Sequence, residues 1–313
     1  MPDLAVTPDD VARAAEIVRG RLHRTPIFSA RSLREGLSLK AELFQRTGSF
    51  KPRGVLTSLA ALGPEERSRG VISVSAGNHA QALAWGAGEE GIDALLVMWR
   101  GASAAKVAAT RAYGAEVDLH AADPAEAFGR LHDLVEATGR VFVHPFDAPA
   151  TIAGQGTVGL EVLQDVPGVD TVVVPCGGGG LVSGVAVACV PAGVRVVAVE
   201  PAGSTALRSG LAAGAPVPVR PDSIADALSA PFAGEHAVRI CAALGVEVVT
   251  VSDDEIREAF RTLYARAKLA VEPGAAASLA AVLAGGIDGE RIVAVVSGGN
   301  VSAEIASGIL AGR

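Results

Sequence analysis

Cysteine is scarce in this sequence of 313 residues, and the three that are present, Cys176, Cys189 and Cys241, are not clustered. They provide neither a disulfide framework nor the paired spacing of a zinc site. We therefore expect small buried apolar side chains in a reducing, cytoplasmic setting. The chain also lacks a basic segment followed by an apolar one near its start, so no secretory signal peptide is predicted.

Basic residues are in the minority, because 27 Lys and Arg stand against 34 Asp and Glu, a net charge of -7. A protein that grips nucleic acid broadly needs a basic surplus to displace the counterions of the phosphates. Nucleic acid is therefore not a predicted partner. Since 50% of the residues are hydrophobic and 19% are charged, the composition is typical of a globular chain with a substantial core.

One long uncharged stretch, residues 171–194, has the length needed to span a membrane. It contains Pro175, Pro191 and four consecutive glycines at 177–180, which would break a spanning helix. The same residues are explained by a buried strand, a glycine loop and a helix, so no membrane span is predicted.

Short apolar segments alternate with helical ones along most of the chain, after a first helix that begins at Thr7 with Pro8 in its first turn. This pattern predicts an α/β fold of two lobes, with parallel-rich twisted sheets covered by helices. The predicted strands are residues 71–74, 94–98, 116–119, 141–143, 171–174, 194–199, 246–251 and 292–296, and one of the predicted helices covers residues 253–268.

A glycine loop, CGGGGL at 176–181, follows one predicted strand and opens a helix. Glycines let the backbone approach an anion closely, and the first amides of a helix point at it, so a phosphate is the expected ligand. The spacing is neither that of a P-loop nor the dinucleotide fingerprint. A purely structural tight turn remains an alternative.

A second loop, SAGNH, has the same position between a strand and a helix. Its helix start offers a second anion site, suited to a substrate carboxylate. Asn78 can donate and accept a hydrogen bond at once, although simple helix capping would also explain Asn78 and His79.

Lys51 directly precedes a proline, so a helix is expected to begin there. An ammonium at the positive end of the helix dipole favours the neutral amine that Schiff-base chemistry needs, whereas a solvated surface lysine is the alternative. Arg53 is expected to form a structural ion pair. Ser297, after the last strand, and Glu272, before a proline, are ambiguous when taken alone.

Taken together and in order, the segments HRTP, GSFKPRG, SAGNHAQAL, HPFDAPATIAGQGT, PCGGGGLVSG, AVEP, SIADAL, VSDDEI, VEP and VSGGN span nearly the whole chain. They resemble the fold type II (β-family) pyridoxal-phosphate enzymes, and most of all the threonine/serine dehydratase branch, which is related to serine racemase. The resemblance implies a tryptophan synthase β-like fold with a large cofactor-binding domain (1–65 and 146–313) and a small substrate-loop domain (66–145). It also implies a cytoplasmic enzyme, commonly a homodimer.

The resemblance assigns roles to single residues. Lys51 would bind the cofactor covalently and then take the α-proton, Asn78 would hold the phenolic oxygen, and Ser297 would meet the pyridine nitrogen. The implied cofactor site is Phe50, Lys51, Asn78, Gly177, Gly178, Gly179, Gly180, Leu181, Glu272 and Ser297. The implied substrate carboxylate site is Ser75, Ala76, Gly77, Asn78 and His79.

The implied reaction is α,β-elimination from threonine, serine or a similar β-hydroxy amino acid, giving a 2-oxo acid and ammonia. Racemisation is the alternative activity, but Ala76 stands where similar serine racemases have a proton-donating serine. Related enzymes often bind a divalent cation through a glutamate and an aspartate; Glu200 is present but residues 202–206 contain no acid, so no metal site is predicted. The segment 229–235 departs from the usual pattern and leaves the preferred substrate open. A non-catalytic nucleotide-binding α/β protein is the alternative of another class, although it would not need Lys51.

Overall fold

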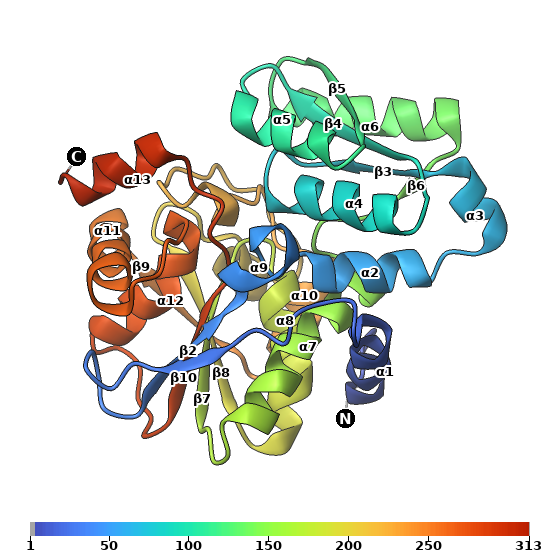
Figure 1. Ribbon diagram of the computed structural model, residues 1–313. Coiled ribbons are helices and arrows are strands. Elements are labelled where there is room, and N and C mark those ends of the chain that lie inside the picture. Colours follow the sequence, from blue (N-terminus) through green and yellow to red (C-terminus); the bar gives the residue numbers. More distant parts are fainter. Residues whose placement is uncertain (1–3, 313) are drawn as a thin grey trace.

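The structure is a computed structural model that describes residues 4–312. Figure 1 shows two lobes, each built on its own sheet with helices packed against it. The six-stranded sheet has the order β1-β2-β10-β7-β8-β9, and the four-stranded sheet the order β5-β4-β3-β6. All neighbouring strands are parallel except β1 and β2. The predicted two-lobed α/β fold is therefore confirmed.

The strands of the larger sheet are β1 (Ile27–Ser29), β2 (Leu37–Ala41), β7 (Thr171–Pro175), β8 (Arg195–Pro201), β9 (Glu247–Val251) and β10 (Ile292–Val296). Those of the smaller sheet are β3 (Val71–Val74), β4 (Ala94–Trp99), β5 (Glu116–Ala121) and β6 (Val141–Phe142). Every residue of β3, β7 and β10 is buried. A parallel strand that is covered on both faces is mostly apolar, which is why these strands can be recognised in the sequence.

The helices that cover the sheets are α1 (Pro8–Val18), α2 (Pro52–Ala60), α3 (Pro64–Arg69), α4 (Asn78–Glu89), α5 (Ala104–Ala112), α6 (Pro124–Thr138), α7 (Pro149–Asp165), α8 (Gly180–Cys189), α9 (Ala206–Ala213), α10 (Glu235–Ala243), α11 (Asp253–Thr262), α12 (Pro273–Leu283) and α13 (Ala303–Leu310). The predicted start of α1 is confirmed: the Thr7 hydroxyl accepts a hydrogen bond from the Asp10 amide at 3.3 Å, and Asp10 accepts from the Thr7 amide at 2.8 Å.

One predicted helix differs in its second half. The sequence pattern extends it from Asp253 to Lys268, but α11 ends at Thr262 and a π-helical turn, η5 (Leu263–Ala267), follows. Lys268 then adopts a left-handed conformation with φ of 62°. This residue closes the helix in the way that glycine commonly does, so apolar spacing alone did not reveal the end.

The three cysteines are free and buried, as the sequence predicts. Burial raises the pKa of the Cys189 and Cys241 thiols to about 12, so both are protonated near neutral pH. Among residues 4–312, no helix combines the length and the apolar character that crossing a membrane requires.

Candidate active site

The loops singled out in the sequence follow the carboxyl ends of strands. Residues 75–79 follow β3, residues 176–179 follow β7, and residues 297–300 follow β10. Within each parallel sheet these ends share one edge, which is where open α/β sheets bind ligands. The chain before α2 reaches the same place, because the Phe50 amide donates to the Ser297 carbonyl at 3.1 Å.

Lys51 lies between the lobes, at the residue that precedes α2. Its Nζ donates to the Pro145 carbonyl at 2.8 Å and lies 5.2 Å from the centre of the Phe50 ring. Burial lowers the pKa of Lys51 to about 8, against the attraction of Glu272. The expected direction of the shift is thus found, with burial as its main cause. A solvated surface lysine does not fit this environment.

The glycine loop is tightly packed by protein atoms. A Cβ on Gly178 would lie 2.5 Å from the Phe146 ring, and one on Gly180 would lie 2.4 Å from the Phe146 carbonyl oxygen. Gly179 has a φ of 92°, and a Cβ there would lie 2.5 Å from that of Ala237. Packing therefore requires these glycines whether or not the loop binds a phosphate. Only an experiment can separate phosphate binding from this structural role. The loop leads directly into α8, whose first amides are the expected anion ligands.

The 75–79 loop enters α4 through Gly77, whose amide donates to the Ser75 hydroxyl at 3.2 Å. The His79 ring is buried, with Nε2 3.0 Å from the Ser73 hydroxyl and 3.3 Å from the Val143 carbonyl oxygen. Burial holds the pKa of His79 well below its usual value, so the ring is neutral. Because the ring of His79 contacts Ser73 and Val143, the backbone amide is the group of His79 that could bind a ligand.

Asn78 does not cap α4 with its side chain. Its Nδ2 donates to Oε1 of Glu272 at 2.7 Å, and its Oδ1 accepts from Nδ2 of Asn300 at 2.8 Å. These bonds connect the two lobes, since Asn78 begins α4 whereas Glu272 precedes α12 and Asn300 follows β10. Sequence reasoning missed Asn300, although it is the last letter of the VSGGN segment.

Glu272 is only 3% exposed, and burial raises its pKa to about 7. A Cβ on Gly298 would lie 2.5 Å from Oε1 of Glu272, so this glycine makes room for the carboxylate. The Glu272 amide donates to the Gly298 carbonyl at 3.1 Å, which brings the residue next to Ser297. The hydroxyl-bearing Ser297 is itself 4% exposed.

Arg53 forms the ion pair expected from the sequence. Its guanidinium is completely buried and contacts Glu42 at 2.8 Å and Glu161 at 2.7 Å. Lys40, also completely buried, pairs with Glu161. This network joins β2, α2 and α7 beneath the segment that carries Lys51, and it balances two cations against two carboxylates.

Both carboxylate oxygens of Glu200 accept hydrogen bonds from the protein. They accept hydrogen bonds from the amides of Leu207 at 2.6 Å and Arg208 at 3.0 Å, at the start of α9. Burial raises the pKa of Glu200 to about 7, although these bonds lower it. Within residues 4–312, no group of three His, Cys, Asp or Glu side chains is arranged to hold a metal ion.

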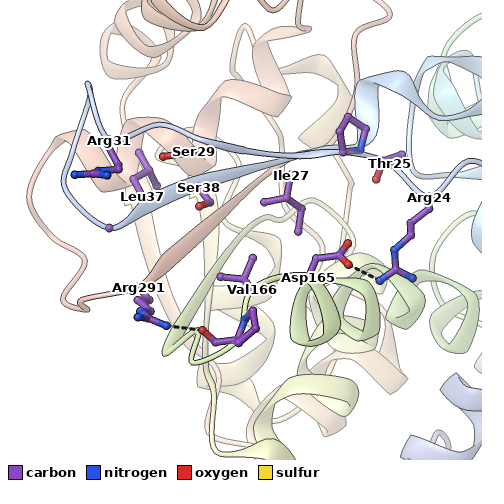
Figure 2. Close-up of a pocket in the computed structure, with 13 residues that line it drawn as sticks. Arg24, Thr25, Ile27, Ser29, Arg31, Leu37, Ser38, Asp165, Val166 and Arg291 are labelled. Carbon is purple, nitrogen blue, oxygen red and sulfur yellow. Dashed lines mark hydrogen bonds and ion pairs between the residues drawn. The ribbon is translucent and has the colours of Figure 1, made fainter.

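A cavity of about 580 Å³ lies away from these loops, at the edge of the larger sheet beside β1 and β2 (Figure 2). Arg24 and Asp165 form an ion pair there, and Arg291 donates to the Pro167 carbonyl at the opposite side. None of the predicted cofactor or substrate residues lines this cavity.

Comparison with known proteins identifies the family of this chain. The catabolic L-threonine dehydratase TdcB of Escherichia coli K12 is 38% identical over 311 residues, which cover 96% of this chain and 94% of that protein. The phenylserine dehydratase of Ralstonia pickettii is 39% identical and covers 97% of this chain and 94% of its own length. The structure of maize serine racemase is 37% identical and superimposes with a TM-score of 0.91 over 96% of this chain and 95% of that one. Residues 18–298 match the family described as pyridoxal-phosphate dependent enzymes, and the chain belongs to that family.

Proposed function

We propose that this protein eliminates water from threonine, serine or a similar small L-β-hydroxy amino acid, and that a 2-oxo acid and ammonia are the products. The observation that carries the proposal is Lys51, a partly buried lysine with a pKa of about 8, whose Nζ donates to the Pro145 carbonyl and whose pKa is influenced by Glu272. The dehydratases named above, each 38–39% identical over almost the whole chain, support the same reaction class.

The cofactor is pyridoxal phosphate, and the polar groups at the site suit it. We propose that the amides of residues 177–181 hold its phosphate, that Ser297 meets the pyridine nitrogen and that Phe50 lies beside the ring. Asn78 would donate to the phenolic oxygen, with Glu272 adjacent. When bound, the cofactor supplies an electron sink for the α-carbon.

The protein's own groups then have two tasks. The Lys51 amine attaches the cofactor and afterwards accepts the α-proton, which requires it to be neutral at working pH. The amides at the start of α4 bind the substrate carboxylate between residues 75 and 79. Glu272 and Ser297 are 3% and 4% exposed, so little water reaches these groups.

The organisation of the chain is part of the proposal. Residues 1–65 and 146–313 would form the large domain that binds the cofactor, and residues 66–145 the small domain that carries the substrate loop. A cytoplasmic homodimer fits the composition and the resemblance, and the lack of an acid in residues 202–206 argues against a divalent-cation site. These statements are tested by light scattering, by limited proteolysis and by activity after chelation.

Racemisation is the second candidate, because maize serine racemase has so similar a structure. Ala76 argues against it, since its methyl group cannot deliver a proton to the opposite face of the α-carbon. A nucleotide-binding protein without catalytic activity would have no use for the environment of Lys51.

Borohydride reduction followed by peptide mass spectrometry tests the assignment of Lys51. We expect a pyridoxyl adduct on its peptide, and no adduct and no 2-oxo acid release with Lys51→Ala. An adduct on Lys40, Lys106 or Lys268 would refute the assignment. A panel of β-hydroxy amino acids, assayed for 2-oxo acid and ammonia, then identifies the preferred substrate.

A further inference from the structure

Asn300 connects three parts of the candidate site through one side-chain amide. Its Nδ2 donates to the Thr47 carbonyl at 2.7 Å and to Oδ1 of Asn78 at 2.8 Å. Thr47 lies in the loop before Lys51, and Asn78 begins α4 in the other lobe. The position of Asn300 therefore couples the lysine loop to the substrate loop.

The direction of these hydrogen bonds is fixed at both ends. A backbone carbonyl can only accept, so Asn300 must present its NH2 group to Thr47. Because the same NH2 group also faces Asn78, Asn78 must present its oxygen in return. The NH2 group of Asn78 then faces the carboxylate of Glu272, to which it donates at 2.7 Å.

The surrounding backbone holds Asn300 in this orientation. Thr47 has a φ of 58°, in the left-handed region that a threonine rarely adopts, and this conformation aims its carbonyl at Asn300. Gly48 follows with a φ of 75°, and a Cβ there would lie 2.5 Å from Oδ1 of Asn300. If the Asn300 amide turned over, its oxygen would face two other oxygens.

We propose that Asn300 is a positioning residue that fixes the direction of the Asn78 amide, so that Asn78 offers a hydrogen-bond donor to the phenolic oxygen of the cofactor. This inference rests on the role of Asn78 in the proposed function. An NH2 group has two hydrogens, and the bond to Glu272 uses one of them. The other serves an anionic oxygen on the ring, whereas a reversed amide would turn its own oxygen towards that anion.

Two substitutions distinguish the effect of the direction of the Asn78 amide from the effect of losing its hydrogen bond with position 300. Asn300→Ala removes the donor, and Asn300→Asp replaces it with a group that only accepts, so that Asn78 turns its NH2 group towards position 300. The test compares equilibrium binding of pyridoxal phosphate to each apoprotein. It also compares the balance between the phenolate and neutral-phenol absorption bands of each complex. We expect binding to weaken roughly 10-fold for Ala and roughly 100-fold for Asp, with a shift towards the neutral phenol that is larger for Asp. Ser302→Ala, which changes the nearby cap of α13, is the matched control and should bind normally.

A double variant provides a second test that remains usable if Asn300→Asp folds poorly. In Asn300→Asp with Glu272→Gln, the glutamine can donate to a reversed Asn78, so the amide chain is satisfied but points the other way. We expect it to fold, to bind more weakly than Glu272→Gln alone and to keep the neutral-phenol band. Asn300→Asp binding as well as Asn300→Ala, or a double variant binding as well as Glu272→Gln, would overturn the inference. Wild-type protein that fails to bind pyridoxal phosphate would instead refute the proposed function.

Discussion

Lys51 and Glu272 have pKa values that burial moves towards each other, to about 8 and about 7. Each group favours the charged form of the other, but the loss of water outweighs this attraction for both. Near neutral pH, a small change in pH therefore alters the protonation of both Lys51 and Glu272. Titratable pairs of this kind are typical of catalytic sites.

The raised pKa of Glu272 predicts a pH-dependent contribution to the stability of the apoprotein. The folded state holds the Glu272 proton up to about pH 7, whereas the unfolded chain releases it near the ordinary pKa of 4.5. The folded state is therefore favoured at low pH, and this contribution is lost as the pH rises through that window. Relative to Glu272→Gln, wild-type protein should lose about 3 kcal/mol between pH 4.5 and 7.5. Urea unfolding of both proteins across this range measures it, and a constant difference would mean that Glu272 does not ionise in a buried site.

Ala76 predicts that elimination exceeds racemisation. Ser75, the nearest hydroxyl in the sequence, accepts a hydrogen bond from the Gly77 amide and is held within its own loop. With L-serine we therefore expect pyruvate and ammonia, and little D-serine in the residual substrate by chiral chromatography. Ala76→Ser should increase D-serine formation by at least about 10-fold, in line with a positioned proton donor. D-serine appearing as fast as pyruvate in the wild type would contradict this interpretation.

At the scale of elements, the site depends on loops that leave strands at one edge and are packed against one another. The glycine loop shows why a sequence motif is ambiguous here. Gly178 is required by the Phe146 ring, and Gly179 by its left-handed backbone and by Ala237. Loss of cofactor after a substitution in this loop would therefore not by itself show phosphate binding.

A paired substitution resolves this ambiguity. Gly178→Ala should destabilise the protein by about 1–3 kcal/mol, because its methyl group would overlap the Phe146 ring. Adding Phe146→Ala removes the overlap and should recover part of that loss, relative to Phe146→Ala alone. If the loop binds phosphate through closely approaching amides, affinity for pyridoxal phosphate stays reduced in the double variant. Affinity that returns to the level of Phe146→Ala would show that Gly178 acts through packing only. Urea unfolding and cofactor titration give the two quantities.

The sequence predicts the elements that are buried on both faces better than those at the edges. The strands β3, β4, β7 and β10 consist mainly of apolar residues, so their positions can be recognised in the sequence. The hairpin of β1 and β2 was not predicted, because β1 has three residues, none of them fully buried. In the site, Lys51 and the glycine loop stand out by residue type and position. The role of Asn300 depends on contacts with residues 222 and 253 positions away, which no local pattern encodes.

At the scale of the whole molecule, two lobes lie side by side (Figure 1). Apolar residues of α2 pack against α4, and polar contacts connect the lobes around the site. Asn78 connects them at the centre, through Glu272 and Asn300. Further out, Lys106 on α5 forms an ion pair with Asp226 at 2.5 Å, in the short 3-10 helix η4 (Asp226–Leu228). Both of these charges influence the pKa of Glu272, Asp226 raising it and Lys106 lowering it, so the pair lies close to the site. Because the side chains are 27% and 58% exposed, the pair is accessible to solvent and to salt.

This position predicts that the Lys106–Asp226 pair stabilises the arrangement of the lobes seen in this structure. An exposed pair contributes about 0.2–1 kcal/mol, so Lys106→Ala should raise KM by up to about 5-fold, with a smaller effect on kcat. Arg195→Ala, which breaks an exposed pair with Glu247 inside the larger lobe, is the matched control and should leave KM unchanged.

Charge reversal tests the same contact more strictly. Lys106→Asp places two carboxylates opposite each other and should raise KM further than Lys106→Ala, whereas adding Asp226→Lys restores the attraction and should recover most of the loss. High salt should reduce the difference between wild type and Lys106→Ala, because mobile ions screen an exposed pair but hardly affect the buried bonds of Asn78. Steady-state kinetics at low and high ionic strength measure all four proteins. If the reversed pair stays as impaired as Lys106→Asp alone, the two residues act separately, and this pair does not contribute to holding the lobes together.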